Sequence, residues 1–236
     1  SIGVATDGDA DRLGVLIENG DFLSAQETIL MLADYCKNVK NISGNIVKTS
    51  SVTNKLTKYF SHICSVEDVQ VGFKYICEKM ISDDVAFGCE ESGGFGFKGH
   101  IPERDGIFSS LIFIEMLAYS KLSRLSDYLK LIRNKFGNIF YSRIDYHYSK
   151  SDRLNLLPDL SRKELDFGRF KQIDLLPFYS SRNIINGLKF VFEGNTQWLL
   201  LRSSETEPMI RIYAEGNSDE EVSELLTLGK KLIEPD

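Results

Sequence analysis

Apolar residues in the first 137 positions alternate between strand-like and helix-like spacing. Short apolar runs typical of strands occur at 2–5, 13–17, 46–49, 64–66 and 85–88. Helical spacing is found at 28–36, 54–60 and 73–81. Ser24 and Glu27 have the spacing of a capping box, which predicts where the first helix begins. This alternation predicts an α/β fold with a mostly parallel or mixed sheet and helices on both faces.

Two further helices are expected before position 138. Residues 89–106 are polar and glycine-rich, and we expect a loop there. Residues 107–120 are apolar nearly all round, which is typical of a buried helix, whereas 125–136 are amphipathic. Gly137 and Asn138 close the second helix and mark a predicted domain boundary.

Residues 138–236 have a different pattern, which predicts a smaller α+β domain with an antiparallel sheet. Strands are expected at 139–148, 188–192, 198–201 and 209–214. Asn186 and Gly187 are typical of a hairpin turn, and 151–165 is expected to be irregular. Ser218 or Asp219 can cap a final helix.

Composition and charge exclude several classes of protein. The chain has 236 residues, of which 42% are hydrophobic and 26% charged, as in ordinary globular proteins. Its net charge of -6 does not favour nucleic acid as a partner. No apolar run reaches the roughly 18 residues of a membrane span, so no membrane partner is expected. The four cysteines form no CxxC pair, which indicates neither a zinc site nor a disulfide framework, and a reducing cytoplasm is the expected location.

An acidic loop between the first two predicted strands is the strongest candidate site. Asp7, Asp9 and Asp11 stand at alternate positions and are followed by Arg12. Carboxylates with this spacing can turn their oxygens toward one point, an arrangement that suits Mg²⁺. The adjacent guanidinium indicates that the metal's other partner is an anion such as phosphate.

Other interpretations of this loop are open. An EF-hand would need glycine where Arg12 stands and helices on both sides. A phosphatase would use Asp7 as nucleophile and Asp9 as acid/base, although that pattern usually continues with Thr or Val where this chain has Asp11. A plain acidic hairpin turn is the structural alternative.

A second candidate loop, 88–94, follows a predicted strand at the place where open α/β sheets bind ligands. Glu90 can accept hydrogen bonds from two sugar hydroxyls, and Ser92 can donate or accept one. The alternative is a flexible acidic surface loop.

A third candidate loop, 202–208, joins two predicted strands of the last domain. Arg202, Ser204 and Thr206 could hold a dianion together with turning backbone amides, and Arg211 could help from the next strand. The alternative is an ordinary polar turn.

Three lesser candidates lie between these loops. Lys74 opens a helix where an anion would be stabilised, and His100 and Arg104 lie in the long loop before 107. The structural alternatives are a solvated lysine and a histidine that only stabilises its loop.

In order and spacing these segments resemble the α-D-phosphohexomutases, the phosphoglucomutase and phosphomannomutase superfamily. The matching segments are 7–12, 71–74, 90–93, 100–106 and 202–208, so the resemblance runs nearly end to end. It implies that residues 1–24 are the tail of the family's second domain with its metal loop. Residues 25–137 would then be the third domain with the sugar loop, and 138–236 the fourth with the phosphate loop.

The resemblance implies an intramolecular phosphotransferase of the isomerase class. It would interconvert hexose 1-phosphate and hexose 6-phosphate, of glucose or mannose, through a phosphoserine enzyme and a hexose 1,6-bisphosphate. The implied metal ligands to Mg²⁺ are Asp7, Asp9 and Asp11. The implied contacts to substrate are Arg12 on the transferring phosphate, Glu90 and Ser92 on the sugar, Arg202, Ser204, Thr206 and Arg211 on the other phosphate, and Lys74 and His100 in substrate contact or proton transfer.

The chain also departs from the family pattern. No segment matches the phosphoserine loop, because Ser61 and His62 lack the Asn-Pro that follows in the family. We therefore expect the nucleophile in missing N-terminal domains, and no turnover by this fragment alone. Cys89 stands where relatives usually have glycine, and Glu205 adds a carboxylate that would repel phosphate unless it points outward. A Mg²⁺-dependent phosphatase and a non-catalytic sugar-phosphate-binding module are the alternatives.

Overall fold

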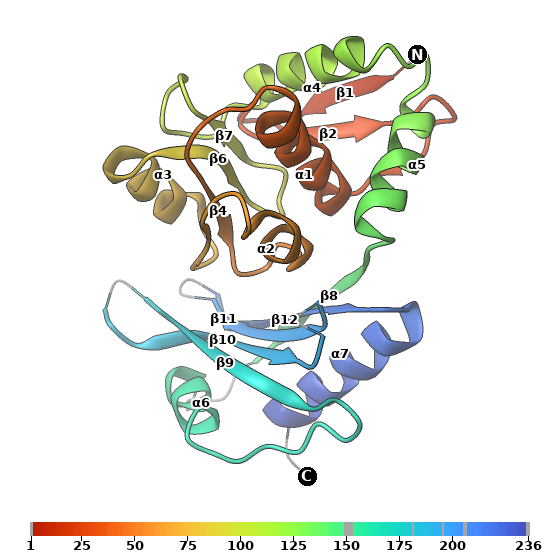
Figure 1. The fold of residues 1–236 in the computed structure, drawn as a ribbon. Coiled ribbons are helices and arrows are strands. Elements are labelled where there is room, and N and C mark those ends of the chain that lie inside the picture. The colour runs from red at the N-terminus through yellow and green to blue at the C-terminus, as the bar shows by residue number, and fades with distance from the viewer. Residues whose placement is uncertain (1, 149–152, 181, 195, 205–206, 235–236) are drawn as a thin grey trace. The chain divides into compact units, whose positions relative to one another are not determined.

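The computed structural model describes residues 2–148, 153–180, 182–194, 196–204 and 207–234. The chain divides into two compact units, Ser1–Asn138 and Ile139–Asp236 (Figure 1). The first unit is α/β, and the second is an antiparallel sheet with helices, which confirms the predicted fold class. The assignment of residues 1–24 to a separate family domain stays a prediction.

The acidic loop connects two strands of a small antiparallel sheet in the first unit. This sheet has the order β1 (Gly3–Thr6), β2 (Leu13–Leu16), β3 (Phe22–Leu23). Thr6 pairs with Leu13 in the β1–β2 hairpin. The hairpin therefore brings the two ends of the acidic loop together.

A second sheet of the first unit is mixed. Its order is β5 (Val66–Val69), β4 (Asn45–Thr49), β6 (Val85–Cys89), β7 (Phe95–Phe97). β4 is parallel to β5 and β6, and β7 is antiparallel to β6. The expectation of a loop throughout 89–106 is wrong at β7, because three residues are too few to show strand alternation. The strand expected at 64–66 begins only at Val66.

Five α-helices of the first unit surround these sheets. They are α1 (Ala25–Asp34), α2 (Lys55–Phe60), α3 (Phe73–Ser82), α4 (Gly106–Ser120) and α5 (Leu125–Phe136), with a π-helical turn (Tyr35–Val39) after α1. Ser24 caps α1, since its hydroxyl accepts a hydrogen bond from the Glu27 amide at 3.2 Å, as the capping box predicts. α3 packs on β4 and β6 through an apolar cluster of Val47, Val69, Phe73, Ile76 and Val85.

Helix α4 does not fit the prediction of a buried helix. It packs against β1 and β2 with one face, where Phe113 and Met116 are buried. The opposite side chains of Ile107 and Leu111 are each 60% exposed. The prediction is wrong because an all-round apolar composition does not determine how many faces the neighbouring elements cover.

Among the described residues, no single helix is long and apolar enough to cross a membrane. The α4–α5 pair reaches that length and composition only when its two helices are taken together, across a bend of 86°.

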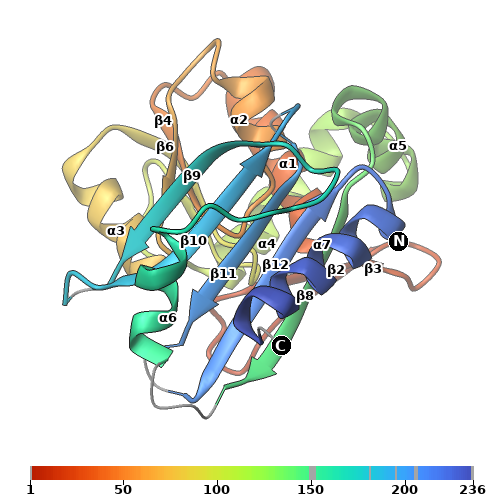
Figure 2. The ribbon, with the colours of Figure 1, turned by 90° about the horizontal axis from the view of Figure 1, so that it is seen from below.

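The second unit is a five-stranded antiparallel sheet with two helices on one face (Figure 2). Its order is β8 (Phe140–His147), β12 (Met209–Gly216), β11 (Trp198–Ser203), β10 (Ile185–Phe192), β9 (Gln172–Tyr179). Helices α6 (Arg153–Leu160) and α7 (Asp219–Ile233) cover an apolar core that includes Leu188, Phe190 and Ile212. Ser218 caps α7, as predicted.

Two local expectations in this unit are wrong. Asn186 and Gly187 lie inside β10, at a register shift opposite β9, and the chain instead turns where Ser180 N donates to Ile184 O. Strand pairing on both sides of β10 outweighs the local turn signal. Helix α6 occupies part of the stretch that we expected to be irregular.

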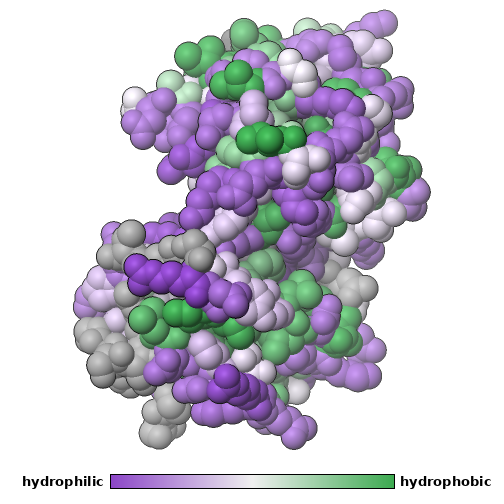
Figure 3. Space-filling view, turned by 90° about the vertical axis from the view of Figure 1, so that its left-hand side faces the viewer, coloured by the Kyte–Doolittle hydropathy of each residue, from purple (hydrophilic) through white to green (hydrophobic). Residues whose placement is uncertain are grey.

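The exposed residues are mixed in polarity. On the face drawn in Figure 3, apolar side chains lie in small groups among hydrophilic ones. Such a mixture is ordinary for the surface of a globular protein.

Candidate functional site

The acidic loop is held by its own first carboxylate. Ala10, with φ 58°, donates its amide to Asp7 O at 3.1 Å and so closes the turn. Asp7 Oδ1 accepts hydrogen bonds from the amides of Asp11 at 3.3 Å and Arg12 at 3.4 Å. Asp7 therefore stabilises the loop conformation through Oδ1, and its second oxygen, Oδ2, makes none of these backbone hydrogen bonds.

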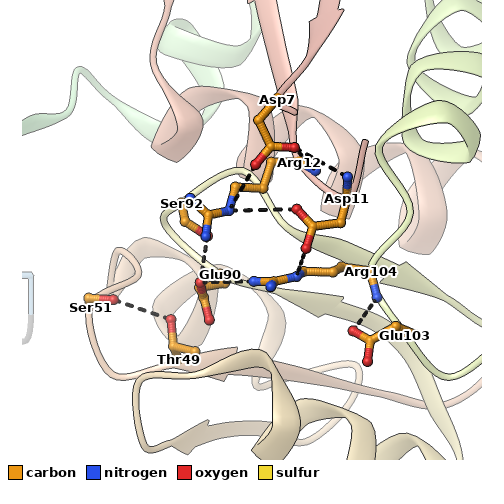
Figure 4. Close-up of polar contacts among 9 residues, drawn as sticks. All are labelled: Asp7, Asp11, Arg12, Thr49, Ser51, Glu90, Ser92, Glu103 and Arg104. Atoms are coloured by element: carbon orange, nitrogen blue, oxygen red, sulfur yellow. Dashed lines mark hydrogen bonds and ion pairs between the residues drawn. The ribbon is translucent and has the colours of Figure 1, made fainter. Parts of the chain in front are cut away.

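Asp11 lies between two guanidinium groups (Figure 4). Its Oδ2 is 2.6 Å from Arg104 Nε, and its Oδ1 is 3.8 Å from Arg12 Nε. That Oδ1 atom is buried and has no hydrogen-bond partner among the described residues. Arg12 is also 3.5 Å from Asp7 Oδ2, and its side chain is 46% exposed. Arg12 can therefore reach a ligand while it remains beside both carboxylates.

The Glu90–Ser92 loop presents a buried carboxylate to the same place. Glu90 is only 6% exposed, and Ser92 Oγ donates to its Oε1 at 2.5 Å. Arg104 Nη1 is 3.9 Å from that same Oε1. The other oxygen, Oε2, is buried without a hydrogen-bond partner in the described part of the chain. Glu90 thus keeps an acceptor available for a hydroxyl group.

Backbone contacts join the acidic loop to the Glu90–Ser92 loop and to the start of α4. Leu13 N donates to Gly93 O at 2.8 Å, and Gly106 N donates to Ala10 O at 2.9 Å. Gly93 has φ +92°, and a Cβ there would lie 2.6 Å from Leu13 O. A Cβ at Gly106 would lie 2.5 Å from Arg12 O. Glycine is therefore required at Gly93 for the two loops to approach this closely, and at Gly106 for α4 to begin beside the acidic loop.

The three aspartates do not converge as the sequence analysis expects. The described residues contain no group of three or more His, Cys, Asp or Glu side chains placed to hold a metal ion. Asp7 is bound by backbone amides and Asp11 by Arg104. Arg12 lies beside both carboxylates, and Asp9 is exposed. The donor set is nevertheless all oxygen, as Mg²⁺ prefers, and Asp11 Oδ1 is unpartnered among the described residues. These residues fit a magnesium ion if the carboxylates rotate toward one another.

The two weaker candidates, Lys74 and His100, are held differently. Lys74 is exposed at the start of α3, with its Nζ 4.7 Å from the centre of the Tyr75 ring. His100 Nε2 lies 2.9 Å from Asp105 Oδ2, and its ring stacks on Phe108 at 3.9 Å. Neither position tests the predicted contact with substrate or the predicted proton transfer, which stay predictions.

Asp105 links His100 to the start of α4. Its carboxylate accepts a hydrogen bond from the Phe108 amide at 2.8 Å and contacts the His100 ring. These two hydrogen bonds lower the pKa of Asp105 below its ordinary value. Asp105 therefore caps α4 at the point where the helix meets the acidic loop.

The sequence pattern gave no function to Arg104 and did not reveal a group of buried polar residues at the end of β4 and directly after it. Lys48 is fully buried and lies 2.5 Å from Asp68 Oδ1. The hydroxyls of Thr49 and Ser51, also buried, are 3.2 Å apart (Figure 4). The available signal was a lysine followed by hydroxyl residues directly after an apolar strand.

Cys89, which replaces an expected glycine, introduces no charge into the Glu90–Ser92 loop. It pairs in register with Lys48 at the ends of two parallel strands. Burial raises the pKa of its thiol, which therefore stays protonated at neutral pH.

The second unit contains a pair of arginines on adjacent strands. Arg202 in β11 and Arg211 in β12 are register partners, so both side chains leave the same face of the sheet. The Nε atoms of both are buried without hydrogen-bond partners in the described ranges. Arg211 has only distant carboxylates, Asp145 at 3.7 Å and Glu207 at 3.6 Å, among the described residues. The pair therefore has donors available for an anion.

The remaining predicted residues of this third loop are partly described. Ser204 lies 7% exposed, and its Oγ accepts a hydrogen bond from the Glu207 amide at 3.2 Å. Ser203 Oγ is buried and has no hydrogen-bond partner among the described residues. Thr206 and Glu205 lie outside the described residues.

Family models match most of the chain, and curated relatives match nearly all of it. The model described as "Phosphoglucomutase/phosphomannomutase, alpha/beta/alpha domain III" matches residues 24–136, and the one for the C-terminal domain matches 160–227. The phosphoglucomutase/phosphomannomutase of Thermococcus kodakarensis is 31% identical over 98% of this chain and 47% of the relative. The phosphoglucosamine/phosphogalactosamine mutase of Sulfurisphaera tokodaii is 30% identical over 99% and 48%. The chain thus spans about half the length of these relatives.

Solved structures agree with the fold. The phosphoglucomutase parafusin of Paramecium, in its open form, superposes with a TM-score of 0.80 at 23% identity, covering 99% of this chain and 45% of that one. An N-acetylphosphoglucosamine mutase of Aspergillus fumigatus, in complex with GlcNAc-6P and magnesium, gives a TM-score of 0.62 at 15% identity over 98% and 51%. Because the family's models for domain III and for the C-terminal domain together match more than half of its residues, the chain belongs to the phosphoglucomutase/phosphomannomutase family.

Proposed function

We propose that this chain supplies the metal, sugar and phosphate loops of a phosphohexomutase that interconverts hexose 1-phosphate and hexose 6-phosphate. One observation carries the proposal: Asp11 of the acidic loop and Glu90 of the sugar loop meet at a single guanidinium, that of Arg104. The acid that we propose for the metal and the acid that we propose for a sugar hydroxyl are therefore neighbours, as phosphoryl transfer to a sugar requires.

The acidic loop would serve the transferring phosphoryl group. Asp7, Asp9 and Asp11 would hold Mg²⁺, which when bound would neutralise charge that develops during transfer. The magnesium in the Aspergillus structure supports the choice of this ion, though not of its ligands. Arg12 is half exposed beside two carboxylates, so its outward N–H groups would bind and orient a phosphate oxygen.

The sugar loop would hold the hexose. Glu90 Oε2 has no hydrogen-bond partner among the described residues and would accept a bond from a sugar hydroxyl. Ser92 already donates to Oε1 and would keep the carboxylate oriented. Glucose or mannose is our proposed hexose.

The loop of the second unit would hold the phosphate that is not reacting. Arg202 and Arg211 have buried Nε donors on one face of the sheet, and Ser204 lies at the end of the same strand pair. Arginine binds phosphate through paired, charge-assisted hydrogen bonds. Thr206 would add a hydroxyl.

Turnover would also need a phosphoserine that these 236 residues do not supply, because no segment of them matches the family's phosphoserine loop. We propose that preceding domains of the same enzyme carry it and that the reaction passes through a hexose 1,6-bisphosphate. A serine-to-alanine variant of the Aspergillus fumigatus mutase has been solved in complex with glucose 1,6-bisphosphate, which supports this intermediate.

An assay of the chain alone and of the enzyme carrying the preceding domains would test this function. With Mg²⁺ and catalytic glucose 1,6-bisphosphate, the longer enzyme should interconvert the 1- and 6-phosphates of glucose or mannose, and the chain alone should not. Phosphate release by the chain alone, abolished by Asp7→Asn, would instead support the phosphatase. Glucosamine 1-phosphate in parallel would show which sugar is preferred.

A further inference from the structure

Arg104 is packed on several sides between the acidic loop and the sugar loop. Its Nε contacts Asp11 Oδ2 at 2.6 Å, and its Nη1 is 3.9 Å from Glu90 Oε1. The guanidinium lies 6.0 Å from the centre of the Phe73 ring, and a Cβ at Gly94 would be 3.1 Å from Arg104 Cδ. The side chain is only 25% exposed. This packing restricts the guanidinium to a short movement between two carboxylates.

Its two contacts are unequal. The bond to Asp11 is short and charge-assisted, whereas the approach to Glu90 is beyond hydrogen-bond distance. A small rotation of the guanidinium would exchange the first partner for the second. Glu90 Oε1 accepts one hydrogen bond, from Ser92, and a carboxylate oxygen can accept a second from the guanidinium.

A divalent cation on Asp11 would compete with Arg104 for the same carboxylate. Two cations held a few ångströms apart repel each other, most strongly in a partly buried site. Asp11 Oδ1 is buried and unpartnered within the described part of the chain, so this carboxylate could bind a cation without first losing the arginine. Full coordination by Asp11 would nevertheless require Arg104 to leave Oδ2.

We propose that Arg104 is the internal counter-ion of the acidic loop. It neutralises Asp11 before the metal ion binds and then turns toward Glu90, so that metal binding and sugar binding are coupled through one side chain. The inference rests on the proposed function for the identity of the two ligands. Arg104 acts in this account as a positioning residue, because it works through Asp11 and Glu90.

Metal affinity measured without substrate tests the proposal. Mn²⁺ takes the same oxygen ligands as Mg²⁺, and the free ion can be counted by electron paramagnetic resonance. Arg104→Met keeps an unbranched, flexible side chain and removes the competing charge, so it should tighten Mn²⁺ binding about tenfold, the equivalent of one charge-assisted contact. Arg104→Lys keeps the positive charge, so its Mn²⁺ affinity should stay within about threefold of that of the unchanged protein.

Lys130→Met provides a matched control. It removes one positive charge from α5, where the side chain is 72% exposed, and should leave Mn²⁺ affinity unchanged. Circular dichroism would verify that each variant is folded. Equal or weaker Mn²⁺ binding by Arg104→Met would overturn the proposal, as would a gain of the same size in Lys130→Met.

A second measurement tests the coupling. In the unchanged protein, Mn²⁺ should alter the affinity for glucose 1-phosphate, and glucose 1-phosphate should alter Mn²⁺ affinity by the same factor. This mutual effect should fall to near onefold in Arg104→Met. If Arg104→Met bound Mn²⁺ more tightly but kept the mutual effect of the two ligands, the proposed coupling through Arg104 would be contradicted. Failure of every variant to bind Mn²⁺ would remove both this inference and the proposed metal function, whereas normal binding without an effect of Arg104 would remove the inference alone.

Discussion

The acidic site of the first unit and the arginine pair of the second differ in how their charges are balanced. Asp7 is bound by backbone amides, Asp11 by Arg104, and Glu90 by Ser92. Arg202 and Arg211 instead have buried Nε atoms without hydrogen-bond partners among the described residues. In the first site Asp7, Asp11 and Glu90 have partners within the site, while the second site has donors left over.

This difference predicts different responses to ligands. A buried donor without an acceptor costs about 1–3 kcal/mol, so an anion that satisfies both arginines should stabilise the second unit. A cation arriving at the acidic site competes with Arg104 for Asp11. Its binding should therefore be weak and should depend on Arg104.

The largest expected effect concerns the junction that holds the acidic site together. Gly93→Ala would place a Cβ 2.6 Å from Leu13 O at φ +92°, and we expect a loss of about 3 kcal/mol in the free energy of unfolding. Gly20 has the same φ of +92° with nothing within 4 Å, so Gly20→Ala should lose only about 1 kcal/mol. Urea unfolding followed by circular dichroism measures both. Equal losses of unfolding free energy in the two variants would mean that the close approach of the two loops does not contribute to stability.

A smaller effect is expected from an anion on the second unit. Trp198 is the only tryptophan of the chain and is fully buried in β11, so its fluorescence reports on this unit. Phosphate at ten times its dissociation constant should raise the free energy of unfolding by about 1.4 kcal/mol. Chloride at matched ionic strength serves as the control. A fluorescence transition that phosphate does not move would show that the arginine donors are not an anion site.

The smallest effect concerns the cap between the acidic loop and α4. Asp105→Ala should lower the free energy of unfolding by about 1 kcal/mol, because the Phe108 amide loses its hydrogen-bond acceptor. Asp105→Asn should keep most of that stability at pH 7, since asparagine also caps helices. The pKa of Asp105 is lower in the folded state than its unfolded value of about 3.9. The ionised carboxylate therefore contributes fully to stability above the unfolded pKa, and this contribution is lost as the pH falls through the folded pKa. In thermal unfolding, the difference in melting temperature between the unchanged protein and Asp105→Asn should therefore be smaller at pH 3 than at pH 7.

The position of the loops could be predicted from the sequence because the signals are local. Aspartates stand at alternate positions between two apolar runs, and Glu90 directly follows a third apolar run. These two patterns locate both loops of the first unit at strand ends. The function of Arg104 could not be predicted in this way. It depends on hydrogen bonds that join Leu13 to Gly93, residues far apart in the chain.

The errors in the predicted fold have the same physical origin. The apolar residues of α4 do not reveal that Ile107 and Leu111 lie outside the packed face. Asn186 and Gly187 form a strong turn signal, but pairing of β10 on both sides keeps them extended. In each case tertiary contacts determine what local composition leaves open.

Calorimetric titration of the chain with glucose 1-phosphate is the most direct test of the central claim, that these loops bind a sugar phosphate. The account predicts saturable binding that Arg202→Ala weakens about 30-fold, the equivalent of about 2 kcal/mol for a lost charge-assisted contact. Arg169→Ala should bind normally, because Arg169 pairs with Glu224 outside the arginine loop. Absence of binding, or the same loss in both variants, would contradict the account.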